Sequence, residues 1–351
     1  MSPSRDALRV LVVSGQTGSW RADLVRTVQA DREAVVVDYA APAEATVSFH
    51  RDRPDIVSLD MAGLDSNGRA AALVRDLLAM GPVPILLLVP PEQQRDASMA
   101  ALVAGAVEVM ASPPRWDLAS GSELLRRLHA LGHLSLRRRE RLRSRPRASQ
   151  TPAGMPVSAK GGGDPVVGLA ASTGGPPALA RVLSGLRGLD RPVVVVQHLQ
   201  SGFVDGFLNW MRRESALPVE LAVDGAPLRP GVVLVAPPGL HVILRRGRRV
   251  ALNDEPVTLH RPSADVLFHS MAEHCGSLGI GVILTGMGDD GASGLLALRR
   301  SGGVTIAQDE ASSAVYGMPR AAADLGAVTR VVPLGQICAE ILSAAGVGVA
   351  P

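Results

Sequence analysis

The hydrophobic pattern of the chain is a series of short, charge-free apolar runs separated by stretches in which apolar positions recur every three or four residues. Runs of the first kind are typical of strands buried on both faces, and the second spacing predicts helices. In the first part of the chain, the predicted strands are Leu8–Val13, Ala34–Val37, Ile56–Leu59, Ile85–Val89 and Val107–Met110, and the predicted helices are Trp20–Ala30, Asn67–Met80, Ala97–Ala104 and Leu124–Leu136.

The same alternation returns in the second part of the chain, where several runs again lack any charge. Two shorter runs flank Arg246-Gly247 and predict a β-hairpin. The predicted strands are Pro165–Ala171, Pro192–Val196, Val232–Val235, Val242–Leu244, Arg249–Leu252, Gly281–Thr285, Val304–Ala307 and Val328–Val332, and the predicted helices are Ala178–Leu186, Ala292–Arg300 and Leu334–Ala345.

Two blocks of alternating strands and helices predict an α/β protein with two doubly wound domains, an N-terminal flavodoxin-like domain and a C-terminal domain with a mostly parallel sheet. The length of 351 residues agrees, because it exceeds what one core of usual size needs. Aromatic residues are scarce, at four Phe, three Trp and two Tyr, which suits aliphatic parallel sheets. We expect domains at 1–125 and 165–351, joined by a helix end and a basic linker at 126–164.

The net charge of +3 is modest, but arginines gather at 137–147, ahead of a Pro-, Gly- and Ser-rich stretch. Such a tract can bind nucleic acid, anionic lipid or an acidic protein. No aromatic residue is interleaved and no recognition motif follows, so we interpret it as a solvated helix end and linker, and expect no nucleic-acid partner.

Two cysteines, Cys275 and Cys338, are too few for a disulfide framework and lack metal-ligand spacing. Cys275 follows His274, but a buried thiol is a better interpretation than a nucleophile because no strand-turn context surrounds it. The first residues lack the pattern of a signal peptide, and no stretch reaches membrane-spanning length. We therefore expect a cytoplasmic protein without membrane insertion.

The candidate chemistry begins at Ser172, which follows a buried strand and precedes Thr173, two glycines and two prolines. Small residues two before and two after the serine, Ala170 and Gly174, allow the tight strand-turn-helix connection that exposes a nucleophilic hydroxyl. The same loop could instead hold an anion on its free N–H groups. The turn by itself does not decide between these two interpretations.

Two further uniformly apolar strands end at His198 and at the Asp289-Asp290 pair. In a parallel sheet, the carboxyl ends of neighbouring strands share one edge, where open α/β sheets place their active sites. A serine needs a base to take its proton, and a carboxylate fixes the tautomer of that base. We assign Ser172, His198 and Asp290 to these roles, and Asp289 to a helix cap. This chain order differs from that of α/β-hydrolases, although the chemistry converges.

Six sequence blocks resemble the catalytic domain of the chemotaxis protein-glutamate methylesterases. They occur in the family's order and span nearly all of 165–346. Two departures are mild, namely Ala170 in place of a usual glycine and Leu199-Gln200 in place of Met-Pro. The blocks are Ala171–Pro176, Gln197-His198, Ala236–His241, His260–Phe268, Leu284–Gly291 and Ala307–Ser312, the last followed by Tyr316–Pro319.

The resemblance implies a serine hydrolase that removes methyl groups from glutamate γ-methyl esters on the cytoplasmic helices of chemoreceptors, and that can also deamidate receptor glutamines. It implies catalytic roles for Ser172, His198 and Asp290, and an oxyanion hole at the backbone N–H of Met287 with Thr173 nearby. Methylated chemoreceptors and a chemotaxis histidine kinase are the partners it implies, and no cofactor is expected. Arg261 could orient receptor carboxylates or belong to a packed turn.

The first domain resembles the receiver domain of two-component response regulators, on the segment Arg53–Asp60 that would carry the phospho-accepting aspartate, Asp60. The acidic pair that holds Mg²⁺ in receivers is replaced here by Ser14-Gly15. The expected hydroxyl and lysine positions fall near Val89-Pro90 and Ser112-Pro113. Without these groups, the charge of a transferring phosphoryl group is not neutralised. We therefore expect a receiver fold that has lost ordinary phosphorylation and Mg²⁺ binding.

Two rivals to a receptor methylesterase remain. One is a non-catalytic scaffold that keeps the second domain for receptor docking. The other is a hydrolase of a different ester, since a set of catalytic residues does not name its substrate.

Overall fold

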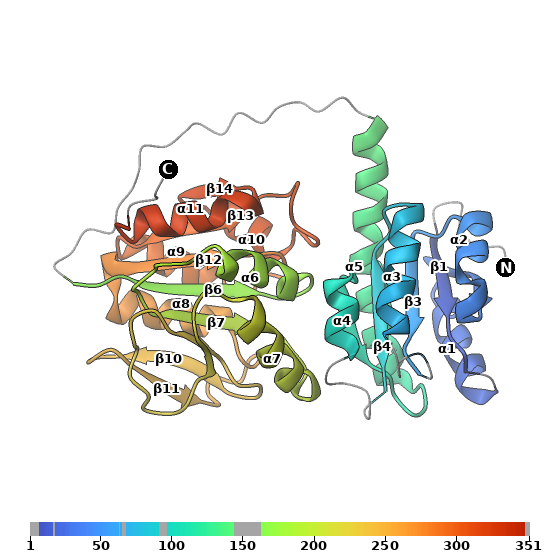
Figure 1. The fold of residues 1–351 in the computed structure, drawn as a ribbon, viewed down its shortest axis with the longest axis horizontal. Helices are drawn as coiled ribbons and strands as arrows, with labels where there is room; N and C mark the ends of the chain where they lie inside the picture. Colours follow the sequence, from blue (N-terminus) through green and yellow to red (C-terminus); the bar gives the residue numbers. More distant parts are fainter. Residues whose placement is uncertain are drawn as a thin grey trace. The chain divides into compact units, whose positions relative to one another are not determined.

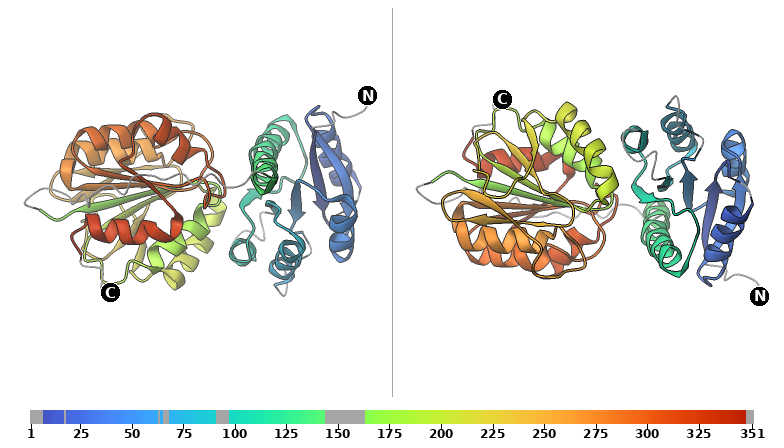
Figure 2. Two further views of the ribbon diagram at one scale, coloured as in Figure 1. Left: turned by 90° about the horizontal axis from the view of Figure 1, so that it is seen from above. Right: turned by 90° about the horizontal axis from the view of Figure 1, so that it is seen from below.

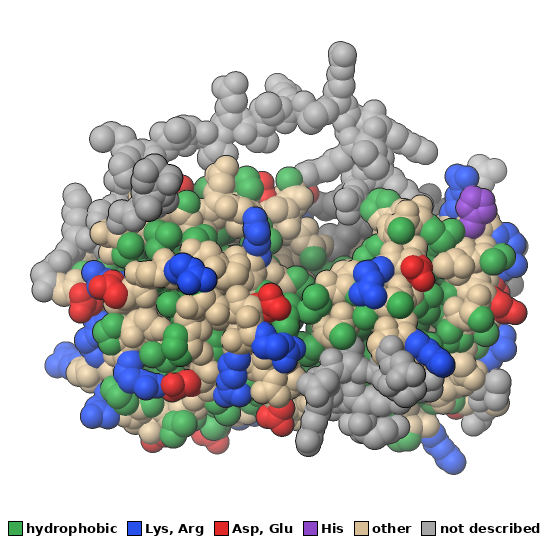
Figure 3. All heavy atoms as spheres, viewed as in Figure 1, with side chains coloured by type: hydrophobic (Ala, Val, Ile, Leu, Met, Phe, Trp, Pro, Cys, Tyr) green, Lys and Arg blue, Asp and Glu red, His purple; other side chains and the backbone are tan. Residues whose placement is uncertain are grey.

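The computed structural model describes residues 7–16, 18–62, 64, 68–90, 97–143 and 163–347. The chain divides into two compact units, one within 1–148 and the other within 149–351 (Figure 1). Each unit is a parallel sheet covered by helices, as the alternating pattern predicts. Charged side chains of both signs are dispersed over the face shown in Figure 3.

The first unit contains a five-stranded parallel sheet in the order β2-β1-β3-β4-β5, which is the flavodoxin-like order. Helices α1 and α5 contact each other on one side, while α2, α3 and α4 form a row through the contacts of α3 with its two neighbours. The elements are β1 (Leu8–Val13), α1 (Ser19–Gln29), β2 (Ala34–Ala40), α2 (Ala45–Asp52), β3 (Ile56–Asp60), α3 (Arg69–Met80), β4 (Ile85–Val89), α4 (Ala97–Val103), β5 (Glu108–Ala111) and α5 (Leu118–Arg143).

Helix α5 differs from the prediction in its length. It begins at Leu118 and runs to Arg143, so the predicted domain boundary at residue 125 falls inside it. Leu128 and Leu131 are fully buried, and they hold this part of the helix in the first unit. The first half of the arginine tract is thus helical, and residues 144–162 of the linker predicted within 126–164 lie outside the described residues.

The second unit contains a seven-stranded parallel sheet in the order β14-β13-β12-β6-β7-β9-β8. The predicted hairpin forms a separate antiparallel pair, β10 with β11. The strands are β6 (Val166–Ala171), β7 (Val193–Gln197), β8 (Val219–Leu221), β9 (Val233–Val235), β10 (His241–Arg245), β11 (Arg249–Asn253), β12 (Gly279–Ile283), β13 (Val304–Gln308) and β14 (Arg330–Val332).

Helices cover both faces of this sheet (Figure 2), with α8, α9 and α10 on one face and α6, α7 and α11 on the other. Three of them, α7, α8 and α10, are absent from the predicted elements, as is β8. Ser263 caps α8 by accepting a hydrogen bond from the N–H of Val266. The helices are α6 (Gly175–Ser184), α7 (Val204–Glu214), α8 (Ala264–His274), α9 (Ala292–Arg300), α10 (Met318–Asp324) and α11 (Leu334–Ala344).

Strand β6 is the point at which the strand order changes direction, because β7 lies on one side of it and β12 on the other. The register pairs Ala171 with Gln197 and Ala170 with Ile283, so the three strands end level with one another. Open α/β sheets bind their ligands at the carboxyl ends of strands at such a point. The loops that leave β6, β7 and β12 carry the three predicted site residues.

Candidate active site

Ser172 is the first residue after β6, and its half-exposed side chain lies at the edge of the sheet. Its N–H donates to the carbonyl of Thr285 at 3.0 Å, and its carbonyl accepts from the N–H of Gly175 at 2.8 Å. Gly174 has a φ of 73°, and a Cβ there would collide with Ala314. The turn therefore needs glycine at this position, as the spacing of small residues predicts.

Gln197 fixes the backbone of Ser172 relative to that of His198. Its side-chain amide donates to the carbonyl of Ser172 at 2.9 Å and to that of His198 at 3.1 Å. The N–H of His198 donates to the carbonyl of Ala171 at 3.1 Å. A Cβ at position 175 would collide with the Gln197 amide, so Gly175 leaves the space for this buried side chain. The Gln197 amide thus adds two side-chain hydrogen bonds to the backbone pairing that joins the ends of β6 and β7.

Asp290 lies in the loop after β12 and accepts four hydrogen bonds. His198 Nε2 is 2.8 Å from its Oδ2, and the Ser263 hydroxyl is 2.6 Å from its Oδ1. The N–H groups of Ala264 and Asp265, at the start of α8, donate at 2.7 and 3.1 Å. Burial raises the pKa of the Asp290 carboxyl, but these donors outweigh it and lower the pKa to about 2. Asp290 is therefore ionised at neutral pH.

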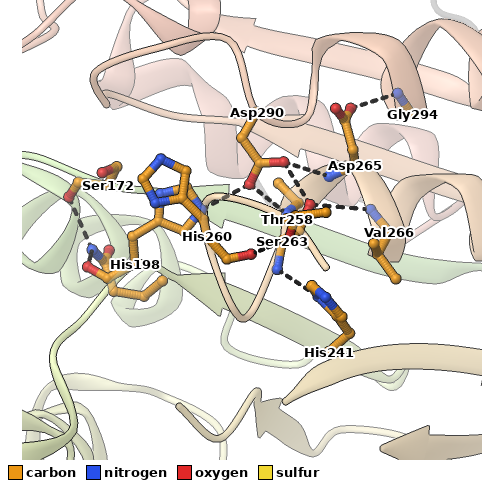
Figure 4. A network of polar contacts seen from close by, with 12 residues as sticks. Ser172, His198, His241, Thr258, His260, Ser263, Asp265, Val266, Asp290 and Gly294 are labelled. Atoms are coloured by element: carbon orange, nitrogen blue, oxygen red, sulfur yellow. Dashed lines mark hydrogen bonds and ion pairs between the residues drawn. The ribbon is translucent and has the colours of Figure 1, made fainter. Parts of the chain in front are cut away.

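The two nitrogens of His198 have different surroundings. Nε2 faces Asp290, which as a carboxylate can only accept, so Nε2 carries the proton and Nδ1 is the basic nitrogen. Nδ1 is buried and has no hydrogen-bond partner among the described residues. In Figure 4, Ser172 lies on one side of the imidazole ring and Asp290 on the other. The hydroxyl of Ser172 must turn toward Nδ1 before a proton can pass, as is common in ligand-free sites.

A second ring, that of His260, stacks on His198. The two ring centroids are 4.1 Å apart and the ring planes differ by 13° (Figure 4). His260 lies in the loop between β11 and α8, within a block that resembles the family, but the sequence gives no signal that it contacts His198.

Behind the site, the fully buried His241 supports Ser263. The ring of His241 accepts from the N–H of Ser263 at Nδ1, at 3.1 Å, and its Nε2 lies 3.0 Å from the carbonyl of Pro256. His241 is therefore the Nε2-protonated tautomer, because a carbonyl can only accept. These two hydrogen bonds join both ends of the segment 256–263 to His241, and the hydroxyl of Ser263 in turn donates to Asp290.

Two predicted roles concern stabilisation of an oxyanion. A Cβ on Gly286 would approach the Cβ of Ser172 to 2.8 Å, so the segment that leads into Met287 lies directly beside Ser172. Thr173 is buried, and its carbonyl accepts from the Thr285 hydroxyl at 2.9 Å. Both residues therefore border Ser172, and the N–H of Met287, with Thr173 nearby, remains our prediction for the oxyanion hole.

The prediction that Asp289 caps a helix is wrong. The residue that precedes α9 is Gly291, with a φ of 95°, and no side chain caps the helix there. The Asp289 side chain is exposed, and the backbone carbonyl of this residue accepts from the N–H of Ala292 at 3.0 Å. Asp290 instead caps α8, and Asp265 of α8 accepts from the N–H of Gly294 in α9 at 2.7 Å.

Cys275 does not have the properties of a nucleophile. Burial raises the pKa of its thiol to about 11, so the thiol stays protonated at neutral pH. Among the described residues, no three His, Cys, Asp or Glu side chains are grouped so that they could hold a metal ion. None of the described helices has the length and apolar character needed to cross a bilayer.

Asp60 ends β3 in the first unit and is fully buried. The Ser14 hydroxyl donates to its Oδ2 at 2.6 Å, the Gln16 amide donates at 3.1 Å, and the N–H of Ala62 reaches Oδ1 at 3.1 Å. Burial raises the pKa of Asp60, and these three donors lower it by less. Neutral donors thus surround this carboxyl where receivers have an acidic pair and a cation.

Residues 167–341 match the CheB methylesterase family. The chain is 40% identical to protein-glutamate methylesterase/protein-glutamine glutaminase 2 of Anaeromyxobacter dehalogenans, over 94% of this chain and 95% of that one. It is 38% identical to the protein-glutamate methylesterase FrzG of Myxococcus xanthus, over 87% and 88% of the two chains.

This chain belongs to the CheB methylesterase family. The crystal structure of the CheB methylesterase catalytic domain of Thermotoga maritima is 33% identical, with a TM-score of 0.49, and covers 51% of this chain and 98% of that one. Since the relatives are similar over nearly their whole length, the membership includes both units of the chain.

Proposed function

We propose that this CheB methylesterase family member hydrolyses glutamate γ-methyl esters on the cytoplasmic helices of chemoreceptors and deamidates receptor glutamines. The observation that carries the proposal is the pairing of His198 with Asp290 across the end of β6, where Ser172 leaves the sheet. The relatives named above are methylesterases, and one is also named a glutaminase. A chemotaxis histidine kinase is the second partner that we propose, with the cytoplasm as the site of action.

In the proposed mechanism, Ser172 Oγ attacks the ester carbonyl carbon while its proton passes to His198 Nδ1. Asp290 stabilises the resulting imidazolium through Nε2, and its low pKa keeps it charged throughout. The N–H of Met287, with Thr173 nearby, stabilises the oxyanion of the tetrahedral intermediate. The intermediate breaks its bond to the methoxy oxygen, which takes the proton from Nδ1 and leaves as methanol.

Water then releases the acyl group by the same steps in reverse. His198 Nδ1 takes a proton from the water as the water attacks the acyl carbon, and returns it to Ser172 Oγ as the bond to that oxygen breaks. The glutamic acid side chain that is released then loses its remaining proton to water. With a glutamine side chain, the first leaving group is ammonia instead of methanol.

The exposed residues beside the site are evidence for a protein substrate. Val257 and Leu259, which precede His260, expose 75% and 92% of their surface, and Arg261, which follows it, is also exposed. Large apolar side chains this exposed beside a reactive centre suit contact with another protein surface. The Arg261 side chain also donates to the carbonyl of Asp254 at 3.1 Å, a contact that fits its packing in the turn.

The test is methanol release from a methylated chemoreceptor. We expect the parent chain to release methanol and Ser172→Ala to release at least about a thousandfold less. Ser184→Ala, which removes an exposed hydroxyl on α6, is the matched control and should keep full activity. A parent chain that binds the receptor without releasing methanol would be a scaffold, and one that hydrolyses only small esters would have another substrate.

For the first unit, we propose that Asp60 is not phosphorylated in the ordinary way. Its carboxyl is buried and accepts from Ser14 and Gln16, which cannot hold Mg²⁺ as two carboxylates would. Incubation with acetyl phosphate and Mg²⁺ should leave the parent chain and Asp60→Asn equally unlabelled. A label that appears on the parent and is lost in Asp60→Asn would overturn this proposal.

A further inference from the structure

The stack of His260 on His198 has no role in the mechanism proposed above. Asp290 holds the His198 ring at Nε2, which is one point on its rim. The covalent bond at Cγ and the hydrogen bond at Nε2 lie on opposite sides of the ring, so they leave it free to rotate about the line between them, and such a rotation moves Nδ1. Transfer of a proton requires the two heavy atoms to come within hydrogen-bond distance, so the orientation of the ring affects the rate.

His260 supplies the missing constraint. With centroids 4.1 Å apart and planes within 13°, its ring covers one face of the His198 ring. A flat ring at van der Waals distance blocks any rotation of His198 that would bring an edge toward it. The Asp290 hydrogen bond and the His260 stack together fix both a point and a plane of the imidazole.

The position of His260 is itself held by several contacts. The Thr258 hydroxyl donates to the carbonyl of His260 at 2.6 Å. On one side of this segment, the carbonyl of Pro256 is joined to His241, and on the other Ser263 is joined to both His241 and Asp290. The loop that carries the second ring is thus fastened to the carboxylate that holds the first.

We propose that His260 is a positioning residue, which orients His198 by stacking and so sets how readily Nδ1 accepts the proton of Ser172. This inference rests on the proposed function for the roles of Ser172 and His198. The inference requires that the side chain at position 260 be a planar ring, but not that it be ionisable. A role of His260 in proton transfer would require an ionisable ring, so the two roles can be distinguished.

The experiment compares Phe, Leu and Ala at position 260. His260→Phe keeps a flat ring, His260→Leu keeps an apolar side chain without one, and His260→Ala leaves the face of His198 open. We expect His260→Phe to retain kcat within about threefold, and the Leu and Ala variants to lose about tenfold to a hundredfold in kcat with an unchanged KM. The control is His269→Ala, an exposed histidine on α8 outside the site, which should keep the parental kcat.

Both methanol release from methylated receptor and hydrolysis of p-nitrophenyl acetate are measured for each variant. Equal losses of kcat in the Phe and Ala variants would assign His260 to proton transfer or to polar substrate contact. Parental kcat in all three variants would mean that the stack has no influence on the rate. Either result overturns the inference. If the parent hydrolyses the small ester but not the receptor ester, the proposed substrate is wrong, while the comparison of the variants at position 260 on the small ester still tests the role of His260. Thermal unfolding of each variant shows whether a loss of kcat accompanies a loss of fold.

Discussion

Asp60 and Asp290 both lie at the carboxyl edge of a parallel sheet, and each accepts a 2.6 Å hydrogen bond from a serine hydroxyl, Ser14 in one case and Ser263 in the other. The pKa values of the two carboxyls nevertheless move in opposite directions. Burial raises both, so burial alone does not explain the difference. What differs is the set of further donors.

Asp290 has a partner that can carry a positive charge, His198, and two N–H groups at the N-terminus of α8. The positive end of a helix dipole and a protonatable ring both favour the carboxylate. Among the described residues, the donors to Asp60 besides the serine are the neutral Gln16 amide and one loop N–H. The same type of position thus favours a charged carboxyl in one unit and disfavours it in the other.

The largest expected effect is on catalysis by the two asparagine variants. Asp290→Asn keeps the shape of the side chain but removes the charge and can leave His198 in the wrong tautomer, so kcat should fall by about a thousandfold or more. Asp60→Asn should keep kcat within about twofold. Both are measured as methanol release under saturating substrate. An Asp290→Asn variant with more than a tenth of the parental kcat would contradict the role given to this carboxylate.

The pH dependence of stability should have opposite signs at the two sites. The pKa of Asp290 lies at about 2 against 3.8 for a free Asp, so its contribution of about 2 kcal/mol is present above about pH 4 and lost as the pH falls toward 2. Asp60 has a raised pKa, so its contribution is present below the unfolded value and lost as the pH rises through the folded one.

Chemical denaturation of the full chain at about pH 3 and about pH 7 checks these signs. Relative to the parent, Asp290→Asn should be more destabilising at the higher pH, and Asp60→Asn should become less destabilising there. The effect of the new amide on packing is the same at both pH values, so it cancels when the destabilisation of each variant at one pH is subtracted from that at the other. Two variants that respond to pH in the same direction would refute the contrast between the sites.

The strands and their meeting point follow from the sequence because buried parallel strands are uniform apolar runs. β6, β7 and β12 could be predicted in this way, and so could the placement of Ser172 and His198 at their ends. Helix α8 is not among the predicted elements, although Leu267, Phe268 and Met271 have helical spacing and Ser263 is a good cap. Its start follows a proline-containing loop, and local patterns define the ends of elements poorly in such places.

The support of the site depends on contacts between distant segments, which no local pattern encodes. Asp289 is close in sequence to α9, and this makes it look like a cap, whereas Asp290 caps α8, a helix that begins 26 residues earlier. His260 stacks on a ring 62 positions away, and the buried His241 fastens the loop of His260 from a β-hairpin. The signal for these residues in the sequence is their presence in the family-like blocks, and their roles come from the fold.

The smallest expected effect, and the finest test of the contrast, removes the matched serine hydroxyls. Ser263→Ala takes one of four donors from Asp290, so the pKa of this carboxyl should rise and kcat should fall by about tenfold. Ser14→Ala takes the shortest hydrogen bond from Asp60 and should leave kcat unchanged while reducing the free energy of unfolding by about 1 to 3 kcal/mol. Threonine at either position keeps a hydroxyl and should restore most of each loss. Equal effects of the two alanine variants on kcat would mean that the two carboxyls are functionally alike, because only a carboxylate that acts on His198 can transmit a lost hydroxyl to the rate.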